Sequence, residues 1–296
     1  MSAFEHTPVL LDEVLEQLDP RAGGVYADVT LGGGGHAKAI LERSSPDGRL
    51  IGTDRDPSAL EAASAALSGF GDRATLRKAR ISELPEVLAS LQIEKVDGVL
   101  ADLGVSSVHL DRAERGFSLA KDGPIDMRMD PTEGETALDL IGRSDAEELA
   151  NVIYRYGEEH RSRKIARSLR RAYEEGELET TGDLRHAVHR AIGGRRGRID
   201  PATKTFQALR IAVNDELGEL EALLEQAPQL VRIGGVVAVI SFHSLEDRMV
   251  KHAFRDSEQL SPLTKRPIVA SDAERDDNPR SRSAKLRAAR RVEVGA

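Results

Sequence analysis

Four consecutive glycines, Gly32 to Gly35, separate a short apolar segment that ends near Asp28 from a segment with helical spacing. A strand, a glycine turn and a helix in this order are typical of proteins with alternating strands and helices. Glycine lets the backbone adopt positive φ and lets a ligand approach the main chain, while the following helix presents unpaired N–H groups. The spacing Gly32-x-Gly34-x-x-Ala37 fits the dinucleotide fingerprint, but alone it is a weak signal.

Segments that resemble strands and helices also alternate in the N-terminal and C-terminal parts of the chain. Apolar runs bounded by turn residues predict strands, and apolar residues three and four apart predict helices. The alternation predicts an α/β fold with a parallel sheet, whose ligands bind at the carboxyl ends of the strands. The expected strands are 25–31, 48–54, 74–77, 96–102 and 236–241, and the expected helices are 6–18, 36–41, 57–67, 84–91, 206–224 and 244–254.

Carboxylates end two of the expected strands, at Asp54 and Asp102, and would lie at the same edge as the glycine turn. Asp54 stands where a carboxylate accepts hydrogen bonds from ribose hydroxyls, a feature that NAD and S-adenosylmethionine share. Asp28, just before the turn, would repel a pyrophosphate and attract an ammonium or a sulfonium. The residues therefore favour S-adenosylmethionine over NAD. A turn that only packs a helix on the sheet is the structural alternative.

Asp102 and His243 are the candidate catalytic residues. A hydrogen-bond acceptor at the end of the fourth strand, before Ser106-Ser107, could orient an exocyclic amine and take up its proton. Capping of the next helix or turn explains Asp102 equally well on spacing alone. His243 follows the last strand, where a single histidine is more often structural. His36 is expected to shape the glycine turn, and the sequence shows no obvious metal-binding cluster.

The middle of the chain has a different character. Residues 115–131 lack a sustained period and predict a long loop, which Phe117, Ile125, Met127 and Met129 would pack in place. Its charged residues, Asp126, Arg128 and Asp130, suit a salt-bridged scaffold or an acceptor-binding element. Three helices without strands follow, the first opened by a capping box at Ser144 and Glu147. We expect an inserted helical domain at 109–203, between α/β parts at 1–108 and 204–296.

Composition limits the possible functions. The net charge of −8 argues against a generally basic nucleic-acid binder, yet basic residues cluster at 155–171, 195–198 and 280–291. These clusters suit either phosphate binding or a solvated helix face. The absence of cysteine, of a signal peptide and of a long apolar run predicts a cytoplasmic protein without membrane spans. The oligomeric state, monomer or homodimer, stays open.

Longer motifs resemble a known family, the bacterial 16S ribosomal RNA cytosine-N4 methyltransferases of the RsmH (MraW) type. The resemblance extends nearly from end to end. The stretches that carry it are His6–Glu13, Asp28–His36, Asp54–Pro57, Asp102–Ser107, Glu114–Ser118, Asp122–Pro131, Thr205–Ile211, Ser241–Arg248 and Asn278–Ser283.

The resemblance implies a class I (Rossmann-like) methyltransferase sheet with a helical insertion, S-adenosylmethionine as donor, and a decoding-region cytosine of 16S rRNA in the small ribosomal subunit as acceptor. A non-catalytic rRNA-binding factor and an NAD-dependent oxidoreductase are the alternatives. The family usually has an aromatic residue at Ile81, glutamine at His109, and His and Arg at Asp200 and Lys204. The donor-binding positions that carry over are Gly34, Gly35, His36, Asp54, Ile81, Asp102 and His109.

Overall fold

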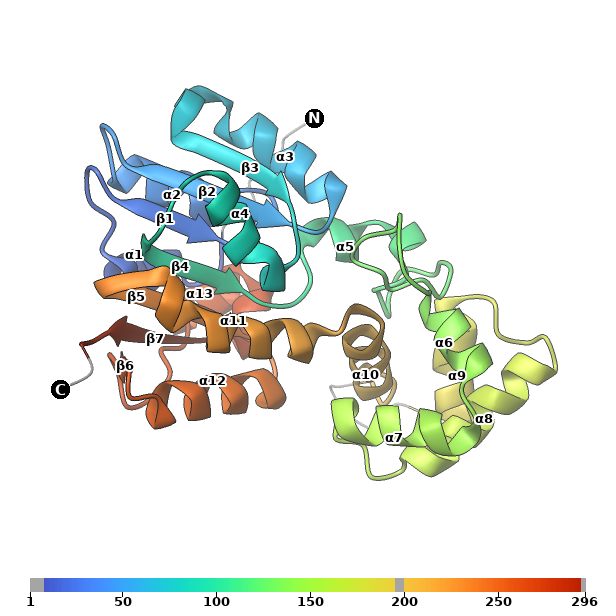
Figure 1. Ribbon diagram of the computed structural model, residues 1–296. Coiled ribbons are helices and arrows are strands. Elements are labelled where there is room, and N and C mark those ends of the chain that lie inside the picture. The colour runs from blue at the N-terminus through green and yellow to red at the C-terminus, as the bar shows by residue number, and fades with distance from the viewer. Residues whose placement is uncertain (1–7, 195–199, 294–296) are drawn as a thin grey trace. The chain divides into compact units, whose positions relative to one another are not determined.

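The computed structural model describes residues 8–194 and 200–293, which form two compact units (Figure 1). The first unit combines Met1–Gly104 with Leu217–Ala296, and the second is Val105–Glu216. The expected insertion, 109–203, falls within the second unit, which also contains α10 (Thr203–Asn214). His6 and Thr7 of the first expected helix, and the basic cluster Arg195, Arg196 and Arg198, lie outside the described residues.

A seven-stranded sheet in the order β3-β2-β1-β4-β5-β7-β6 forms the centre of the first unit. The first five strands of this order pair in parallel, and β7 runs antiparallel to both β5 and β6. The chain builds outward from β1 to β3 and then returns to start β4 beside β1, which creates a topological switch point between β1 and β4. This arrangement confirms the predicted class I sheet. The strands are β1 (Val25–Asp28), β2 (Arg49–Asp54), β3 (Ala74–Lys78), β4 (Val96–Asp102), β5 (Val231–Ser241), β6 (Leu260–Pro262) and β7 (Lys285–Arg291).

Helices cover both faces of the sheet (Figure 1). Strand residues alternate between the faces, so that Val237 and Val239 join one apolar core while Ala238 and Ile240 join the other. The first core includes side chains of α4 (Leu84–Ser90), α11 (Glu216–Leu230) and α12 (Ser244–Asp256). The second includes those of α1 (Leu11–Leu18), α2 (Gly35–Arg43) and α3 (Pro57–Leu67). Two buried cores therefore hold the strand ends in place. The short helices of this unit are α13 (Asp272–Asp277) and the 3-10 turns Ser68–Arg73, Ile81–Glu83 and Pro279–Ser283.

The second unit has its own apolar core, built from helices and from the long loop. Ile125 and Met127 of the loop are 2% and 1% exposed, which confirms that the loop is ordered by packing. Phe117 is also buried in this core. The helices are α5 (Ser107–Asp111), α6 (Ala137–Arg143), α7 (Ala146–Gly157), α8 (Ser162–Glu174), α9 (Thr181–Ile192) and α10, with a 3-10 turn at Ala113–Arg115.

The expected helix 206–224 was wrong, because the segment forms two helices. α10 ends at Asn214, and Asp215 adopts the left-handed conformation with φ of 49° before α11 begins. Aspartate tolerates this conformation better than most residues, so the apolar spacing continues while the helix does not. The first helix also begins later than expected, at Leu11.

Two further local expectations need correction. The capping box lies one residue later, where the Asp145 carboxylate accepts hydrogen bonds from the Glu147 and Glu148 N–H groups. No strand was expected after residue 256, yet β6 and β7 complete the sheet. β7 is rich in arginine and alanine and lacks the β-branched residues that usually signal a strand.

None of the described helices is long and apolar enough to cross a membrane.

Candidate functional site

Three aspartates lie at the carboxyl ends of three neighbouring strands. Asp28, Asp54 and Asp102 are the last residues of β1, β2 and β4, and β1 lies between the other two. The glycine turn follows β1 directly. The predicted convergence of these groups on one edge is therefore confirmed, and it coincides with the switch point of the sheet.

The glycine turn combines packing with an open side. Gly34 has φ of 81°, and a Cβ there would lie 3.3 Å from the Cα of Ala63 on α3. A Cβ at Gly35 would lie only 2.5 Å from Pro8 Cγ. Both glycines thus let the turn pack on its own unit. A Cβ at Gly33 would meet nothing within 4 Å, so the turn faces open space there.

Backbone hydrogen bonds fix the orientation of Asp54. Its Oδ2 accepts from the Gly32 N–H at 2.9 Å, and its Oδ1 accepts from the Asp56 N–H at 2.9 Å. The side chain is half-buried, and its orientation is set by the very turn that would surround a ligand. A carboxylate fixed at this strand end suits the hydroxyl groups of a ribose.

Asp28 is buried, and the pKa of its carboxyl group is raised. It is 1% exposed, and its Oδ1 accepts from the Thr30 N–H at 3.1 Å. Burial raises the pKa of Asp28 to about 7; the hydrogen bonds from Thr30 oppose this rise, and the charge of Asp54 adds to it. A cationic ligand nearby would stabilise the charged form.

Asp102 combines a fixed backbone with an unsatisfied carboxyl oxygen. Its N–H donates to Thr30 Oγ1 at 2.5 Å, whereas Oδ1 is buried and makes no hydrogen bond within the described part of the chain. The side chain as a whole is 26% exposed. Burial and, to a smaller extent, the charges of Asp28 and Glu246 raise the pKa of Asp102 to about 8. An acceptor held in this way suits a ligand that donates a hydrogen bond.

His36 connects three parts of the first unit. Its Nε2 lies 2.9 Å from the carbonyl oxygen of Val9, and its Nδ1 lies 3.8 Å from Asp102 Oδ2. The ring is 7% exposed. The sequence predicted only that His36 shapes the glycine turn. In the structure it also faces the carboxyl group of Asp102.

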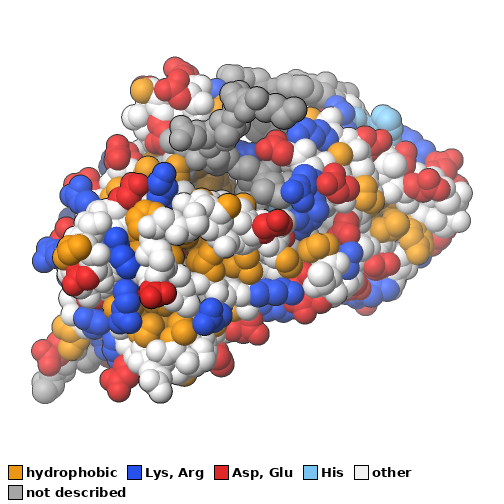
Figure 2. Space-filling view, turned by 90° about the horizontal axis from the view of Figure 1, so that it is seen from above, with side chains coloured by type: hydrophobic (Ala, Val, Ile, Leu, Met, Phe, Trp, Pro, Cys, Tyr) orange, Lys and Arg blue, Asp and Glu red, His pale blue; other side chains and the backbone are white. Residues whose placement is uncertain are grey.

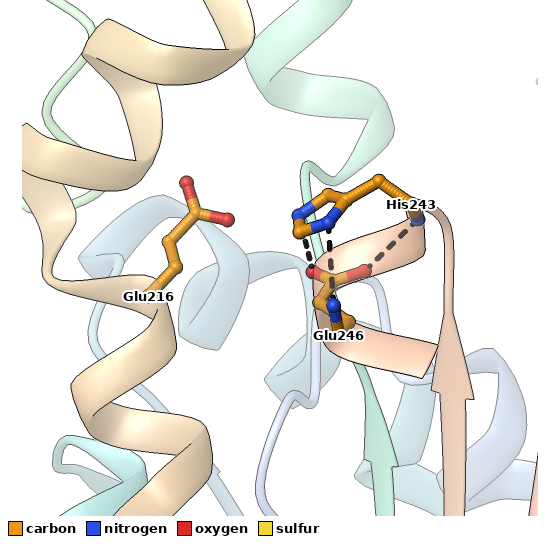
Figure 3. A group of neighbouring side chains, drawn as sticks. All are labelled: Glu216, His243 and Glu246. Carbon is orange, nitrogen blue, oxygen red and sulfur yellow. Dashed lines mark hydrogen bonds and ion pairs between the residues drawn. The ribbon is translucent and has the colours of Figure 1, made fainter. Parts of the chain in front are cut away.

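His243 has a clear structural role as the first residue before α12 (Figure 3). Its Nδ1 accepts a long hydrogen bond of 3.4 Å from the Glu246 N–H, and the Glu246 carboxylate accepts from the His243 N–H at 3.2 Å. The Nε2 atom lies 3.1 Å from Glu246 Oε1, outside hydrogen-bond geometry. This reciprocal capping box satisfies backbone N–H groups at the start of α12. Any role of His243 toward an acceptor would be additional.

Two predicted donor-binding residues have different surroundings. Ile81 opens the 3-10 turn before α4 and packs against the apolar core on that face of the sheet. His109 belongs to the second unit, where its Nδ1 accepts from the Ser106 N–H at 3.1 Å and its ring stacks on Phe117 with centroids 4.7 Å apart. His109 and the three aspartates therefore belong to different units.

The charged residues of the long loop and of the segment before α10 form internal contacts. Arg128 makes two hydrogen bonds of 2.8 Å to the Asp126 carboxylate. Asp130 Oδ1 accepts from the Thr132 N–H and hydroxyl. Asp200 accepts from Arg185 and pairs with His189, both at 2.8 Å. These contacts favour the scaffold interpretation of the loop.

Sequence reasoning missed Thr30 and Glu246. Thr30 holds both Asp28 and Asp102, and its place two residues after Asp28 could have indicated this role. Glu246 follows His243 by three residues, the spacing of a capping box, and its charge acts on Asp102. Both residues shape the environment of the candidate base.

The comparisons with known proteins agree with this geometry. The MraW methylase family model matches residues 3–292. The "Ribosomal RNA small subunit methyltransferase H" of Sorangium cellulosum is 58% identical over 289 residues, which cover 97% of this chain and 91% of the relative. The proteins of the same name from Geobacter sulfurreducens and a Synechococcus species are each 52% identical and cover 98% and 99% of this chain, with 99% of each relative covered. A sheet with three acidic strand ends, and relatives this similar over nearly the whole chain, lead to one conclusion: the chain belongs to the MraW methylase family.

Proposed function

We propose that this methyltransferase transfers a methyl group from S-adenosylmethionine to N4 of a cytosine in the decoding region of 16S rRNA. The single observation that carries the proposal is Asp102, a strand-end carboxyl with a buried oxygen lacking a partner among the described residues and a raised pKa. The relatives named above are ribosomal RNA small subunit methyltransferases, which supports the substrate class.

S-adenosylmethionine is the methyl donor, and the residues of the first unit fit it. Asp54 suits the ribose hydroxyls, and the open side of the turn at Gly33 suits the close approach of the methionine part. The donor has a cationic sulfonium and an ammonium, which the carboxyl groups of Asp28 and Asp102 would attract. When bound, the donor supplies an electrophilic methyl group. We assign donor contacts to Gly34, Gly35, His36, Asp54 and Asp102, and on the resemblance to Ile81 and His109.

Asp102 is the proposed catalytic residue because the reaction must both activate and deprotonate an amine. The lone pair of an exocyclic amine is delocalised into the ring, and a hydrogen-bond acceptor helps to localise it. The amine nitrogen forms a bond to the methyl carbon, the carbon–sulfur bond breaks with its electrons moving to sulfur, and a proton leaves the nitrogen. A carboxylate whose pKa is near 8 accepts this proton more readily than an ordinary aspartate.

His36 is the proposed positioning residue for Asp102. A carbonyl oxygen only accepts hydrogen bonds, so the contact with Val9 places a proton on Nε2. If the ring is neutral, its Nδ1 carries a lone pair that faces Asp102 Oδ2, 3.8 Å away. A small rotation of the carboxyl group would close this distance and let the two groups share the proton that the amine releases.

RNA binding requires local positive charge on an acidic protein. Figure 2 shows Lys and Arg interspersed with Asp and Glu over the face that it displays, without one continuous basic surface. Helix α8 is the strongest candidate in the second unit. Arg163, Lys164 and Arg167 are exposed, and no ion pair or hydrogen bond between described residues engages them. Such side chains suit contacts with the phosphates of the RNA. The target cytosine must also leave its base stack to reach the methyl group.

The test is transfer of a tritiated methyl group to small subunits isolated from cells that lack this protein. We expect label in 16S rRNA with the wild-type enzyme and none with Asp102→Ala. RNA binding without incorporation of label would favour the non-catalytic rRNA-binding factor. Calorimetry with S-adenosylmethionine and NAD side by side separates the third alternative, since an oxidoreductase would bind NAD.

A further inference from the structure

A basic groove lies on the first unit, along α12 and the β6–β7 segment. It encloses a cavity of about 400 Å³ with an apolar floor that includes Phe254. Four cationic side chains line it: Lys251, Arg255, Lys265 and Arg287. The groove belongs to one unit, so its geometry does not depend on the placement of the second.

Two of these four cations have no partner among the described residues. No hydrogen bond or ion pair in the described part of the chain engages the ammonium groups of Lys251 and Lys265, and both residues are exposed. Arg255 makes two hydrogen bonds to Asp256, at 2.6 and 2.8 Å. Arg287 is 11% exposed and pairs with Asp247 at 2.7 Å, which Lys285 also contacts. The four lining cations and Lys285 face two carboxylates, so positive charge remains in the groove.

The basic residues at the end of the chain are mostly structural, which makes this groove more informative than the cluster 280–291. Arg290 donates to the Gly234 carbonyl at 2.8 Å, and Arg291 donates to the Pro228 carbonyl at 2.8 Å. Burial raises the pKa of Asp247, but the hydrogen bonds from Arg287 and Lys285 outweigh this and lower it, so Asp247 is charged. Of the groove side chains, Lys251 and Lys265 are the ones available to bind an anion.

The groove follows α12, and the first residues of this helix interact with the candidate site. Asp247, Lys251 and Arg255 are four residues apart and lie on one face of α12. His243 and Glu246 stand at the start of this helix, and the charge of Glu246 acts on Asp102. With a rise of about 1.5 Å per residue, Lys251 lies about 12 Å and Arg255 about 18 Å along the helix axis from His243. An RNA strand with one base at Asp102 could therefore continue along α12.

We infer that the groove of Lys251, Arg255, Lys265 and Arg287 binds phosphates of the rRNA strand that flanks the target cytosine. This inference rests on the proposed function. Charge complementarity selects the partner, since unpaired ammonium groups over an apolar floor match a phosphate backbone with its sugars. Phosphate contacts position an RNA without reading its sequence. The groove would thus hold the strand while the pocket near Asp102 selects the base.

Charge reversal of the two unpaired lysines tests the inference. The variant Lys251→Glu/Lys265→Glu is compared with Arg43→Glu/Arg49→Glu, which makes the same change in net charge. Arg43 and Arg49 are exposed and stand at the end of α2 and the start of β2, a strand separated from β7 and β6 by β1, β4 and β5. Filter binding to unmethylated 16S rRNA over a range of salt concentrations gives affinity and its salt dependence.

The groove variant should bind the RNA at least about tenfold more weakly than wild type at physiological salt. Its slope of log affinity against log salt should fall by about 2, or about 1 for each lost phosphate contact. The control pair should stay within about twofold of wild type. The milder variant Lys251→Gln/Lys265→Gln should show the same direction of change, and equal calorimetric affinity for S-adenosylmethionine shows that each variant is folded.

The inference is overturned if the groove variants keep the wild-type affinity and slope, or if the control pair loses as much. Failure of the proposed function would look different. In that case the wild-type protein itself would place no tritiated methyl group on small-subunit RNA.

Discussion

At the scale of single residues, the proposed function depends on the hydrogen bonds and pKa values of the carboxyl groups at the edge of the sheet. Asp54 receives two backbone hydrogen bonds that fix its orientation. Asp28 and Asp102 are instead pushed toward the protonated form by burial and by neighbouring acids. Raised pKa values in neighbouring buried carboxyl groups are typical of sites that bind cations or move protons. With a pKa of about 8, Asp102 is mostly protonated at neutral pH in the ligand-free protein, and a cationic donor beside it would favour the carboxylate that accepts the proton.

Replacement of Asp102 by alanine should lower kcat for methyl transfer by about 10²–10⁴-fold, the usual contribution of a positioned acid–base group. Asp102→Asn should lose nearly as much, because an amide can accept a hydrogen bond but not the proton. Tritiated-methyl assays measure both, and circular dichroism checks the fold. Turnover of Asp102→Asn at the wild-type rate would rule out proton acceptance by this residue.

Asp28→Asn should stabilise the ligand-free protein increasingly as the pH rises. The folded-state pKa of about 7 lies above the unfolded value of 3.8, so protonation of Asp28 stabilises the fold fully at low pH. This contribution disappears between about pH 4 and pH 7. The Tm difference between variant and wild type should therefore grow over this window, by about 2 °C or more. Thermal melts at fixed ionic strength measure it, and a constant difference would contradict the raised pKa.

At the scale of elements, the sequence indicated the strands that build the site. The acids end β1, β2 and β4, and apolar runs beside turn residues were enough to find these strands and β3. What local patterns could not show were effects of the whole fold. β7 has arginine and alanine where a strand signal would have valine, and only pairing with β5 makes it a strand. The break between α10 and α11 depends on one backbone angle at Asp215.

The capping role of His243 gives a prediction at this scale. His243→Ala should destabilise the protein by about 1 kcal/mol, because the start of α12 loses its cap. His243→Asn restores a good capping residue and should recover the Tm. If His243 also contacts the acceptor, kcat/KM for the RNA should stay low in His243→Asn although Tm is normal. Full activity of His243→Asn would limit the residue to capping. Paired melts and transfer assays decide between these outcomes.

At the scale of the molecule, an acidic protein must bind RNA through local groups of cations. Sequence clusters were a partial guide, because they do not show which cations already have partners. Arg128, Arg210 and Arg287 are committed to Asp126, Glu216 and Asp247. The long-range pairing of Arg287 and the carbonyl contacts of the last strand appear only in the folded chain. Among the described residues, the exposed cations on α8 and in the α12 groove are our candidates for phosphate contacts.

The α8 surface can be tested separately from the groove. Arg163→Glu/Arg167→Glu should weaken binding to 16S rRNA about tenfold and lower the salt slope by about 2, while the affinity for S-adenosylmethionine stays unchanged. Arg143→Glu/Arg190→Glu is a matched control in the same unit, since both arginines are exposed and already paired with Glu135 and Glu177. Equal losses in the two variants would mean that net charge alone is responsible.

The central claim is methylation of one cytosine amine in the small-subunit RNA. The most direct measurement is mass-spectrometric mapping of 16S rRNA from cells that lack this protein and carry either the wild-type chain or Asp102→Ala. We predict a methyl group on N4 of a single decoding-region cytosine, present with the wild-type chain and absent with the variant and without the protein. An unchanged modification pattern in all three would contradict the account.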